Sequence, residues 1–201
     1  APVAESADRW SGMDCAGVSG RALSSMALDA VRFDEPRFDD AAIAASAEWL
    51  AGRADDDGGY PGAFYPSRTI STSLVLEGLE AARRRGPLPE AARAARDRAI
   101  AWLLSQSSAS GAIGGNALTT SHAVLSLDRA GALPVRTAAE ALAHFTTAQR
   151  GDGRWPGEDY YVAPLGDGRL GPIRSSAVTT ALALAAARRS AAIARGPRAA
   201  G

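Results

Sequence analysis

The 201-residue sequence predicts an all-α protein built as an array of helical hairpins. Three observations lead to this fold class. Apolar residues recur at the spacing of one helical face in about seven segments. Alanine, a strong helix former with little side-chain bulk, is frequent and favours helices in close contact. Short loops alternate with long glycine-rich loops, which is typical of a repeated helix pair.

The first half of the chain is predicted to form four helices after an irregular segment, residues 1–18. They cover residues 19–33, 39–53, 70–84 and 89–107. Apolar side chains at i, i+3, i+4 and i+7 define the first helix, from Leu23 onward. Asp39 and Asp40 cap the second and compensate its dipole. Gly86 and Pro87 end the third, and Pro89 opens the fourth.

The second half is predicted to form three helices, over residues 118–130, 136–149 and 175–194. Hydroxyl residues stand where the first and third of them need N-caps. Gly131 to Pro134 form the short turn between the first two. Residues 196–201 are predicted to be a disordered tail. Residues 19–195 therefore form one repeat domain, and little of the sequence favours a strand.

An internal repeat links the predicted helices. Each unit has a helix with an aromatic residue near its end, then a glycine-rich loop, a Ser/Thr cluster and a helix of small residues and leucine. The aromatic residues are Trp49, Trp102 and Phe145. One hairpin cannot bury its own apolar face, so neighbouring hairpins stack. We therefore expect Trp49 and Trp102 to pack between repeats.

Composition excludes several classes of function. The formal net charge is zero, which argues against nucleic-acid or membrane-surface binding, because both need a basic excess. Cys15 is the single cysteine, so neither an intrachain disulfide nor a cysteine-based zinc site is expected. No apolar run reaches the ~18 residues of a transmembrane helix. All basic residues are arginine, as a GC-rich bacterial genome favours. The first residue is Ala1, which leaves cytoplasmic and secreted, signal-cleaved forms open.

The repeat contains motifs of a known family. The stretch from Gln149 to Trp155, followed by Ser175 to Leu184, resembles the QW repeat of squalene–hopene cyclases and their prenyltransferase-like relatives. Trp102 to Gln106 and Asp57 to Tyr60 supply two further, weaker instances, so the resemblance covers residues 39–190. It implies an α/α toroid, with inner helices around an apolar cavity and outer helices around them. The chain is short for this family, which implies a partial or compact toroid, or one completed by a homo-oligomer or a partner chain.

The sequence also departs from the family. Class II terpene cyclases carry an Asp-x-Asp-Asp acid motif at the start of an inner helix. The corresponding stretches here start at Ile70, Leu118 and Arg174 and contain no acid. The zinc ligands of protein prenyltransferases are not matched either, since Cys15 lies outside the repeats. No catalytic residue is therefore carried over from the family, and no cofactor is expected.

Three residues are candidates for catalysis on their own chemistry. His122 begins a predicted inner helix, where the helix terminus favours the neutral imidazole, a base or hydrogen-bond donor. Asp55 and Asp57 flank a crowded carboxylate loop, which can raise a pKa to give a general acid or hold a divalent ion. The alternatives are a packed histidine and a solvated turn.

Aromatic and hydroxyl residues at the loop end of the array are candidates for substrate binding. Aromatic faces there can stack on a ligand or stabilise a cation. The loop over residues 150–172 is long, and such loops are often functional. Core packing is the alternative for these side chains. The candidates are Tyr60, Tyr65, Thr119, Thr120, Trp155, Tyr160 and Tyr161.

The leading functional hypothesis is a terpene-cyclase-like domain that binds an isoprenoid or other small hydrophobic substrate in a central apolar cavity. It would cyclise that substrate, as an isomerase or lyase, through an unusual proton donor. One alternative is a non-catalytic ligand-binding or protein-interaction scaffold of the same fold. Another is a secreted carbohydrate-active α/α barrel, favoured by the loop aromatic residues.

Overall fold

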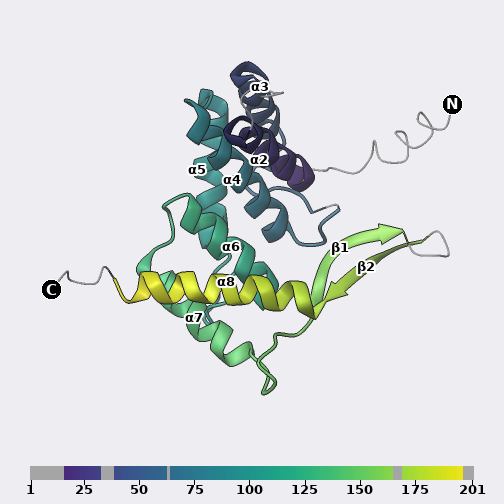
Figure 1. The fold of residues 1–201 in the computed structure, drawn as a ribbon, viewed down its shortest axis with the longest axis vertical. Coiled ribbons are helices and arrows are strands. Elements are labelled where there is room, and N and C mark those ends of the chain that lie inside the picture. Colours follow the sequence, from purple (N-terminus) through teal and green to yellow (C-terminus); the bar gives the residue numbers. More distant parts are fainter. Residues whose placement is uncertain (1–15, 33–38, 63, 165–168, 197–201) are drawn as a thin grey trace.

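The computed structural model describes residues 16–32, 39–62, 64–164 and 169–196. These ranges hold helices and one β-hairpin, coloured from purple to yellow along the chain in Figure 1. The helices of the first half are α2 (Ala16–Arg32), α3 (Asp40–Ala51), α4 (Arg68–Arg85) and α5 (Glu90–Ser105). Those of the second half are α6 (Ala117–Arg129), α7 (Val135–Ala148) and α8 (Ser176–Ala194). The strands are β1 (Glu158–Pro164) and β2 (Leu170–Ser175).

The helices form two sets. In the inner row, α2 contacts α4, α4 contacts α6, and α6 contacts α8. The outer helices pack behind this row: α3 on α2 and α4, α5 on α3 and α4, and α7 on α6 and α8. The alternating array of helical hairpins that the sequence predicts is therefore confirmed. Within the described residues, α2 and α8 are the two ends of the row (Figure 1), so a closed toroid stays a prediction.

The predicted helices are present, with ends that shift by a few residues. Asp39 caps α3 as expected, because its carboxylate accepts the Ala42 N–H at 2.7 Å. Asn116 caps α6 in a capping box, and Ser175 caps α8. The prediction that residues 1–18 are irregular is wrong at its end, since α2 begins at Ala16. The predictions for residues 1–15, 33–38 and 197–201 lie outside the described residues.

Three turns share one geometry and confirm the internal repeat. We call them the repeat turns: residues 55–60, 108–113 and 150–155. In each, the first N–H donates to the fifth carbonyl at 2.8 Å, and the fourth residue is a glycine with positive φ. The sixth N–H then donates to a threonine hydroxyl on the next inner helix. These pairs are Tyr60 with Thr72, Ile113 with Thr120, and Trp155 with Thr180, at 2.9, 3.0 and 3.1 Å.

Glycine allows the inner helices α2 and α4 to touch. A Cβ added at Gly20 would lie 2.5 Å from the Leu74 carbonyl oxygen, and one at Gly78 would lie 2.5 Å from the Gly20 carbonyl oxygen. Neither position could carry a side chain without moving a backbone. The close approach predicted from the small residues is thus made at this pair by glycine, the smallest of them.

The β-hairpin was not predicted from the sequence. β1 pairs antiparallel with β2, and the N–H of Val162 donates to the Phe64 carbonyl at 2.8 Å. Gly171 and Pro172 interrupt β2, and such residues weaken any sequence signal for a strand. The hairpin is held by cross-strand pairing and by aromatic contacts at its base, which depend on tertiary structure.

The two tryptophans expected between repeats differ in environment. Trp102 is 7% exposed: its indole N–H donates to Asp57 at 3.0 Å, and Arg68 lies over the ring at 4.9 Å. Trp49 is 47% exposed, so the prediction that it packs between repeats is wrong. The cause is positional. A repeat turn that precedes α4 covers Trp102, whereas no described residues precede α2 to cover Trp49 in the same way.

Replacement of Gly111 by alanine should destabilise the fold. Its φ is +78°, and an added Cβ would lie 2.1 Å from the Glu140 carbonyl oxygen on α7. Gly131 provides a matched control, with φ of +67° and no atom within 4 Å of an added Cβ. Both variants carry backbone strain, but only Gly111→Ala adds overpacking. Chemical denaturation should show Gly111→Ala lower in stability than Gly131→Ala by about 1–3 kcal/mol. Equal losses would contradict this contact.

Candidate functional site

Four aromatic rings and a histidine meet at the base of the hairpin. We call Phe64, Tyr65, His122, Tyr160 and Tyr161 the aromatic cluster. Phe64 stacks on Tyr161 with ring centroids 5.5 Å apart, and Tyr160 meets Tyr161 edge-on at 5.6 Å. Tyr65 lies 5.9 Å from Tyr160. The cluster therefore joins three separate parts of the chain: the loop before α4, helix α6 and strand β1.

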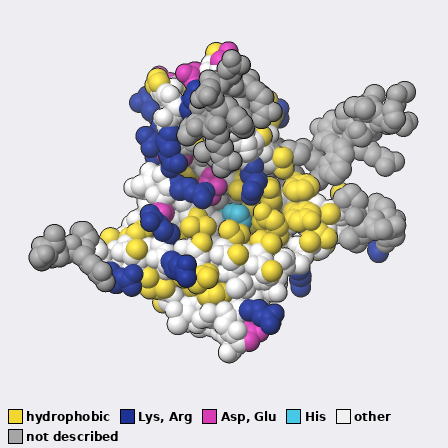
Figure 2. All heavy atoms as spheres, viewed as in Figure 1, with side chains coloured by type: hydrophobic (Ala, Val, Ile, Leu, Met, Phe, Trp, Pro, Cys, Tyr) yellow, Lys and Arg dark blue, Asp and Glu magenta, His cyan; other side chains and the backbone are white. Residues whose placement is uncertain are grey.

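The cluster rests on apolar residues and is partly open. Ile70, Leu74 and Leu118 are buried beneath it, and Val178 and Leu182 of α8 pack against it. Phe64, Tyr160 and Tyr161 are only half-buried. Figure 2 shows a continuous hydrophobic area at this place, with a histidine at its edge. A half-exposed aromatic surface over an apolar base is suited to a hydrophobic ligand.

His122 is the buried polar group of the cluster. It is 4% exposed and stacks on Tyr160 at 6.1 Å. Burial, together with the positive charges of Arg21 and Arg129, lowers its pKa to about 4, so the imidazole is neutral at pH 7. The neutral form predicted from the sequence is supported, with burial as its main cause. Its Nε2 has no hydrogen-bond partner among the residues that the structure describes.

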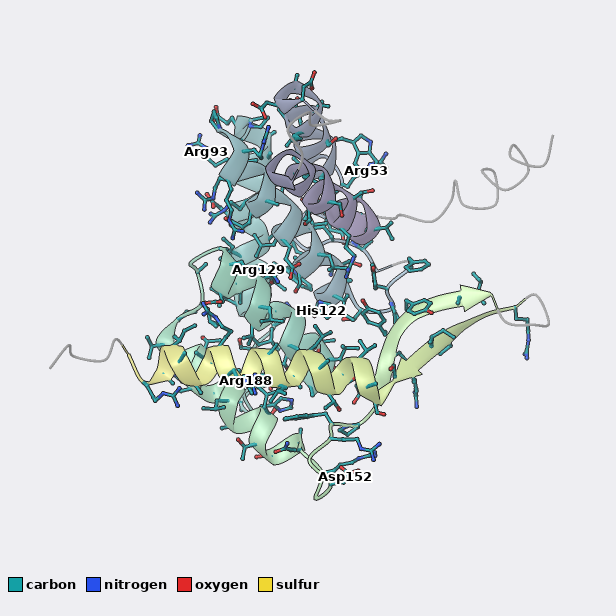
Figure 3. The ribbon with its side chains drawn as sticks, in the orientation of Figure 1. Arg53, Arg93, His122, Arg129, Asp152 and Arg188 are labelled. Atoms are coloured by element: carbon teal, nitrogen blue, oxygen red, sulfur yellow. The ribbon has the colours of Figure 1, made fainter. Side chains whose placement is uncertain are left out.

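His122 lies on the side of α6 that faces away from the outer helices. Ala123 and Leu127 of α6 pack into the core with Phe145 of α7. At 100° per residue, His122 and Arg129 fall on the opposite side of the helix. We call this side of the array the inner face. Figure 3 labels both residues along α6 in the middle of the molecule.

Charged side chains border the cluster on this inner face. Arg129 forms an ion pair of 2.6 Å with Glu77 of α4. Burial raises the pKa of Glu77, and the positive charges of Arg129 and Arg21 oppose the rise. Arg21 of α2 also interacts with the Tyr65 hydroxyl. The border thus carries two cations and one carboxylate, next to a neutral histidine.

The other aromatic candidates lie in the core instead. Tyr60 is fully buried among residues of α2 to α5, and desolvation raises its pKa to about 12. Trp155 is 4% exposed, and its indole N–H donates to the Phe145 carbonyl at 2.9 Å. Each is the sixth residue of its repeat turn, and its backbone N–H donates to a threonine hydroxyl of the next inner helix. For these two residues the structure favours the core-packing alternative.

The hydroxyl candidates serve the start of α6. Thr119 completes the capping box with Asn116. The Thr120 hydroxyl accepts the Ile113 N–H at 3.0 Å and donates to the Asn116 carbonyl at 2.6 Å. Both are buried and fully engaged. Their role in the structure is to anchor a repeat turn to an inner helix.

Asp55 and Asp57 are held by Arg68, each at 2.7 Å. Hydrogen bonds from Arg68 and from the Gly59 backbone hold the pKa of Asp57 at about 2, so it is ionised near neutral pH. Asp152, at the same position of its own repeat turn, likewise accepts a backbone N–H, from Arg154. This repetition favours the turn interpretation. Among the described residues, no three His, Cys, Asp or Glu side chains group as metal ligands would.

The sequence predicted some of the residues of this site. Of its candidates, His122, Tyr65, Tyr160 and Tyr161 meet in the aromatic cluster. It missed Arg21, Glu77 and Arg129, which have no distinctive motif. A usable signal exists for two of them: His122 and Arg129 are seven residues apart, which places them on one helical face.

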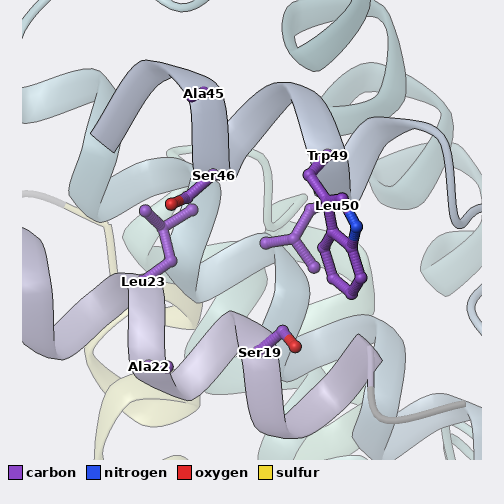
Figure 4. A pocket seen from close by; sticks show the side chains of 7 residues that line it. All are labelled: Ser19, Ala22, Leu23, Ala45, Ser46, Trp49 and Leu50. Atoms are coloured by element: carbon purple, nitrogen blue, oxygen red, sulfur yellow. The ribbon is translucent and has the colours of Figure 1, made fainter. Parts of the chain in front are cut away.

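Two apolar grooves lie away from this cluster. One, of about 400 Å³, lies between α2 and α3 beside Trp49 (Figure 4). The other, of about 330 Å³, lies between α3 and the end of α4, near Arg85 and Leu88. No described helix is long and apolar enough to cross a membrane.

No family model and no curated protein matches this chain. A solved structure described as a protein from Actinoplanes is similar in fold, with a TM-score of 0.60 and 21% sequence identity. The similarity covers 88% of this chain and 55% of that one. The chain thus spans about half the length of a longer protein of the same fold.

Proposed function

We propose that this domain binds a small hydrophobic ligand, of the size and character of an isoprenoid, on the inner face at the aromatic cluster. One observation carries the proposal: half-buried Phe64, Tyr160 and Tyr161 form a continuous apolar surface beside buried His122, whose Nε2 has no partner in the described part of the chain. Burial of such surface contributes roughly 25 cal/mol per Å², which gives aromatic residues their weight in binding.

The polar border gives the ligand an orientation. Arg21 and Arg129 favour a ligand whose polar end carries negative charge or oxygen acceptors. Glu77 already pairs with Arg129, so Arg21 is the cation with more capacity for an added acceptor. A ligand that extends from Arg21 across Tyr160 would match apolar surface with an apolar chain and charge with an acceptor.

Cyclisation of the ligand has less support than binding. Protonation of an alkene needs a strong acid that is protonated near neutral pH. Asp57 is ionised and paired with Arg68, and His122 is neutral and therefore unprotonated. Burial raises the pKa of Glu77, but its ion pair with Arg129 at 2.6 Å favours the ionised carboxylate. A catalytic form of the proposal therefore needs Glu77 to leave this ion pair.

A carbohydrate-binding groove has no support. That alternative needs Tyr60, Tyr65 and Trp155 along one open groove. Tyr60 and Trp155 are buried in separate parts of the core.

Isothermal titration calorimetry, with farnesyl diphosphate and with squalene as the ligands, tests the proposal. We expect saturable binding of at least one of them and no change in the ligand over hours. Tyr161→Ala should weaken binding about tenfold, because loss of one aromatic contact costs ~1–1.5 kcal/mol. Arg21→Ala should weaken binding of the diphosphate but not of squalene.

Trp49→Ala is the matched control, since Trp49 is an exposed aromatic residue that does not belong to the cluster. It should leave both affinities unchanged. If no ligand binds, or if Trp49→Ala and Tyr161→Ala weaken binding equally, the site is elsewhere. Formation of a cyclic product that is lost in Glu77→Gln would replace binding by catalysis.

A further inference from the structure

His122 stands where the other two repeats carry a leucine. In each repeat, the residue two places after the threonine that anchors the repeat turn packs at the aromatic cluster. On α4 and α8 this residue is Leu74 and Leu182, and both belong to the apolar base of the cluster. On α6 it is His122, which stacks on Tyr160. The residues four places earlier are apolar in all three helices: Ile70, Leu118 and Val178. A polar side chain at this position therefore departs from the repeat.

The histidine is costly at this position. It is 4% exposed, and its Nε2 has no hydrogen-bond partner in the described part of the chain. A buried polar atom without a partner destabilises a folded protein, and most such atoms in native structures have a partner. A leucine at this position, as in α4 and α8, would avoid the cost. His122 is therefore best explained by a partner that the described residues do not supply.

Tyr160, which stacks on His122, is the extra residue of a β-bulge. Its neighbours on β1, Asp159 and Tyr161, pair with consecutive residues of β2, so Tyr160 has no cross-strand partner of its own. Bulges occur next to functional sites, where they redirect a side chain. The Tyr160 ring is also only half-buried. It can therefore move away from His122 while both flanking pairs of the hairpin stay in place.

The surroundings of Nε2 select the chemical group that would bind it. The imidazole is neutral at pH 7, so Nε2 either donates or accepts one hydrogen bond, according to the tautomer. A hydroxyl group both donates and accepts, so it fits either tautomer, whereas a carbonyl oxygen fits only one. The positive charges of Arg21 and Arg129 disfavour a cation. An anion would be held by these arginines at the border and not by a neutral imidazole.

We propose that His122 makes the inner-face site specific for a hydrophobic alcohol, whose hydroxyl group hydrogen-bonds Nε2 when the Tyr160 ring moves aside. This inference rests on the proposed function, because the alcohol is the ligand that the aromatic cluster binds. The apolar part of the ligand lies on Phe64 and Tyr161. A hydrocarbon of the same shape binds more weakly, because it leaves Nε2 without a partner.

Farnesol and the hydrocarbon that has hydrogen in place of its hydroxyl group are a matched pair of ligands for titration calorimetry. The wild type should bind farnesol about fivefold more tightly, the equivalent of one net hydrogen bond. His122→Leu introduces the residue of the other two repeats and should bind both ligands equally. Its urea midpoint without ligand should be at least as high as that of the wild type, because the unpartnered nitrogen is gone.

His144→Leu is the matched control. The Nε2 of His144 also has no partner among the described residues, but His144 lies on the outer helix α7 beside Phe145, outside the cluster. This variant should keep the preference for farnesol. The chain contains two histidines, so nitrogen NMR of the wild type labelled at histidine resolves each one. Farnesol should shift the Nε2 resonance of His122 and leave that of His144 unchanged.

The outcomes separate this inference from the proposed function. If the wild type binds both ligands with equal affinity, or if His122→Leu still prefers farnesol, alcohol recognition by His122 is wrong and hydrophobic binding at the cluster stands. An Nε2 resonance of His122 that farnesol does not shift leads to the same conclusion. A lower urea midpoint for His122→Leu would mean that Nε2 already has a partner, which also overturns the inference. If the wild type binds neither ligand, the proposed function fails with it.

Discussion

Replacement of Trp102 by alanine is expected to lower the free energy of unfolding by about 3–5 kcal/mol. Trp102 is 7% exposed and lies in the core with Phe145 and Leu103. The substitution leaves a large cavity and removes the indole N–H that Asp57 accepts at 3.0 Å. It also removes the ring beneath Arg68. Urea denaturation in dilute protein measures the loss.

Trp49→Ala is the control for this prediction, because Trp49 holds the equivalent position in the preceding outer helix. It is 47% exposed, so the expected loss is about 1 kcal/mol or less. Trp102→Phe should fall between the two, since it keeps most of the packing but not the hydrogen bond to Asp57. Similar losses at Trp49 and Trp102 would mean that Trp49 is covered in solution.

The same comparison shows why the repeat could be predicted and its ends could not. Helical spacing, caps such as Asp39 and the Gly-rich turns are local features, and local features place helices correctly. Whether Trp49 is covered depends on a turn elsewhere in the array. A repeat pattern places equivalent residues in equivalent helices, but it does not show which of them a neighbouring turn covers.

The candidate site was predictable in part for a related reason. Tyr65, Tyr160 and His122 could be proposed because aromatic and imidazole groups near loops have chemistry of their own. Tyr60 and Trp155 have the same chemistry and the same kind of loop, yet both are buried by their repeat turns. The hairpin separates these cases, because it brings Tyr160 to His122. Its pairing with the Phe64 carbonyl is a tertiary contact with no sequence motif.

Stability is expected to fall by about 3 kcal/mol as the pH drops from 6.5 to 4, because of His122. In the folded protein its pKa is about 4, against 6.5 for the free side chain. The unfolded chain therefore binds a proton in this window that the folded protein does not. This contribution is fully present above pH 6.5 and is lost progressively down to about pH 4. Urea midpoints at half-unit pH steps measure the slope.

His122→Phe isolates this effect, since a phenyl ring can still stack on Tyr160 but does not titrate. Its stability should depend much less on pH between 6.5 and 4. Glu77 acts in the opposite direction, because its raised pKa means that the folded protein binds more protons than the unfolded chain. Asp57 acts below this window, where its lowered pKa makes stability fall further toward pH 2. Since both groups are retained in His122→Phe, the difference between the two pH profiles reports His122. If the profiles are parallel, His122 is accessible to protons in the folded protein. The premise of the ligand site, that this imidazole is buried and neutral, would then be wrong.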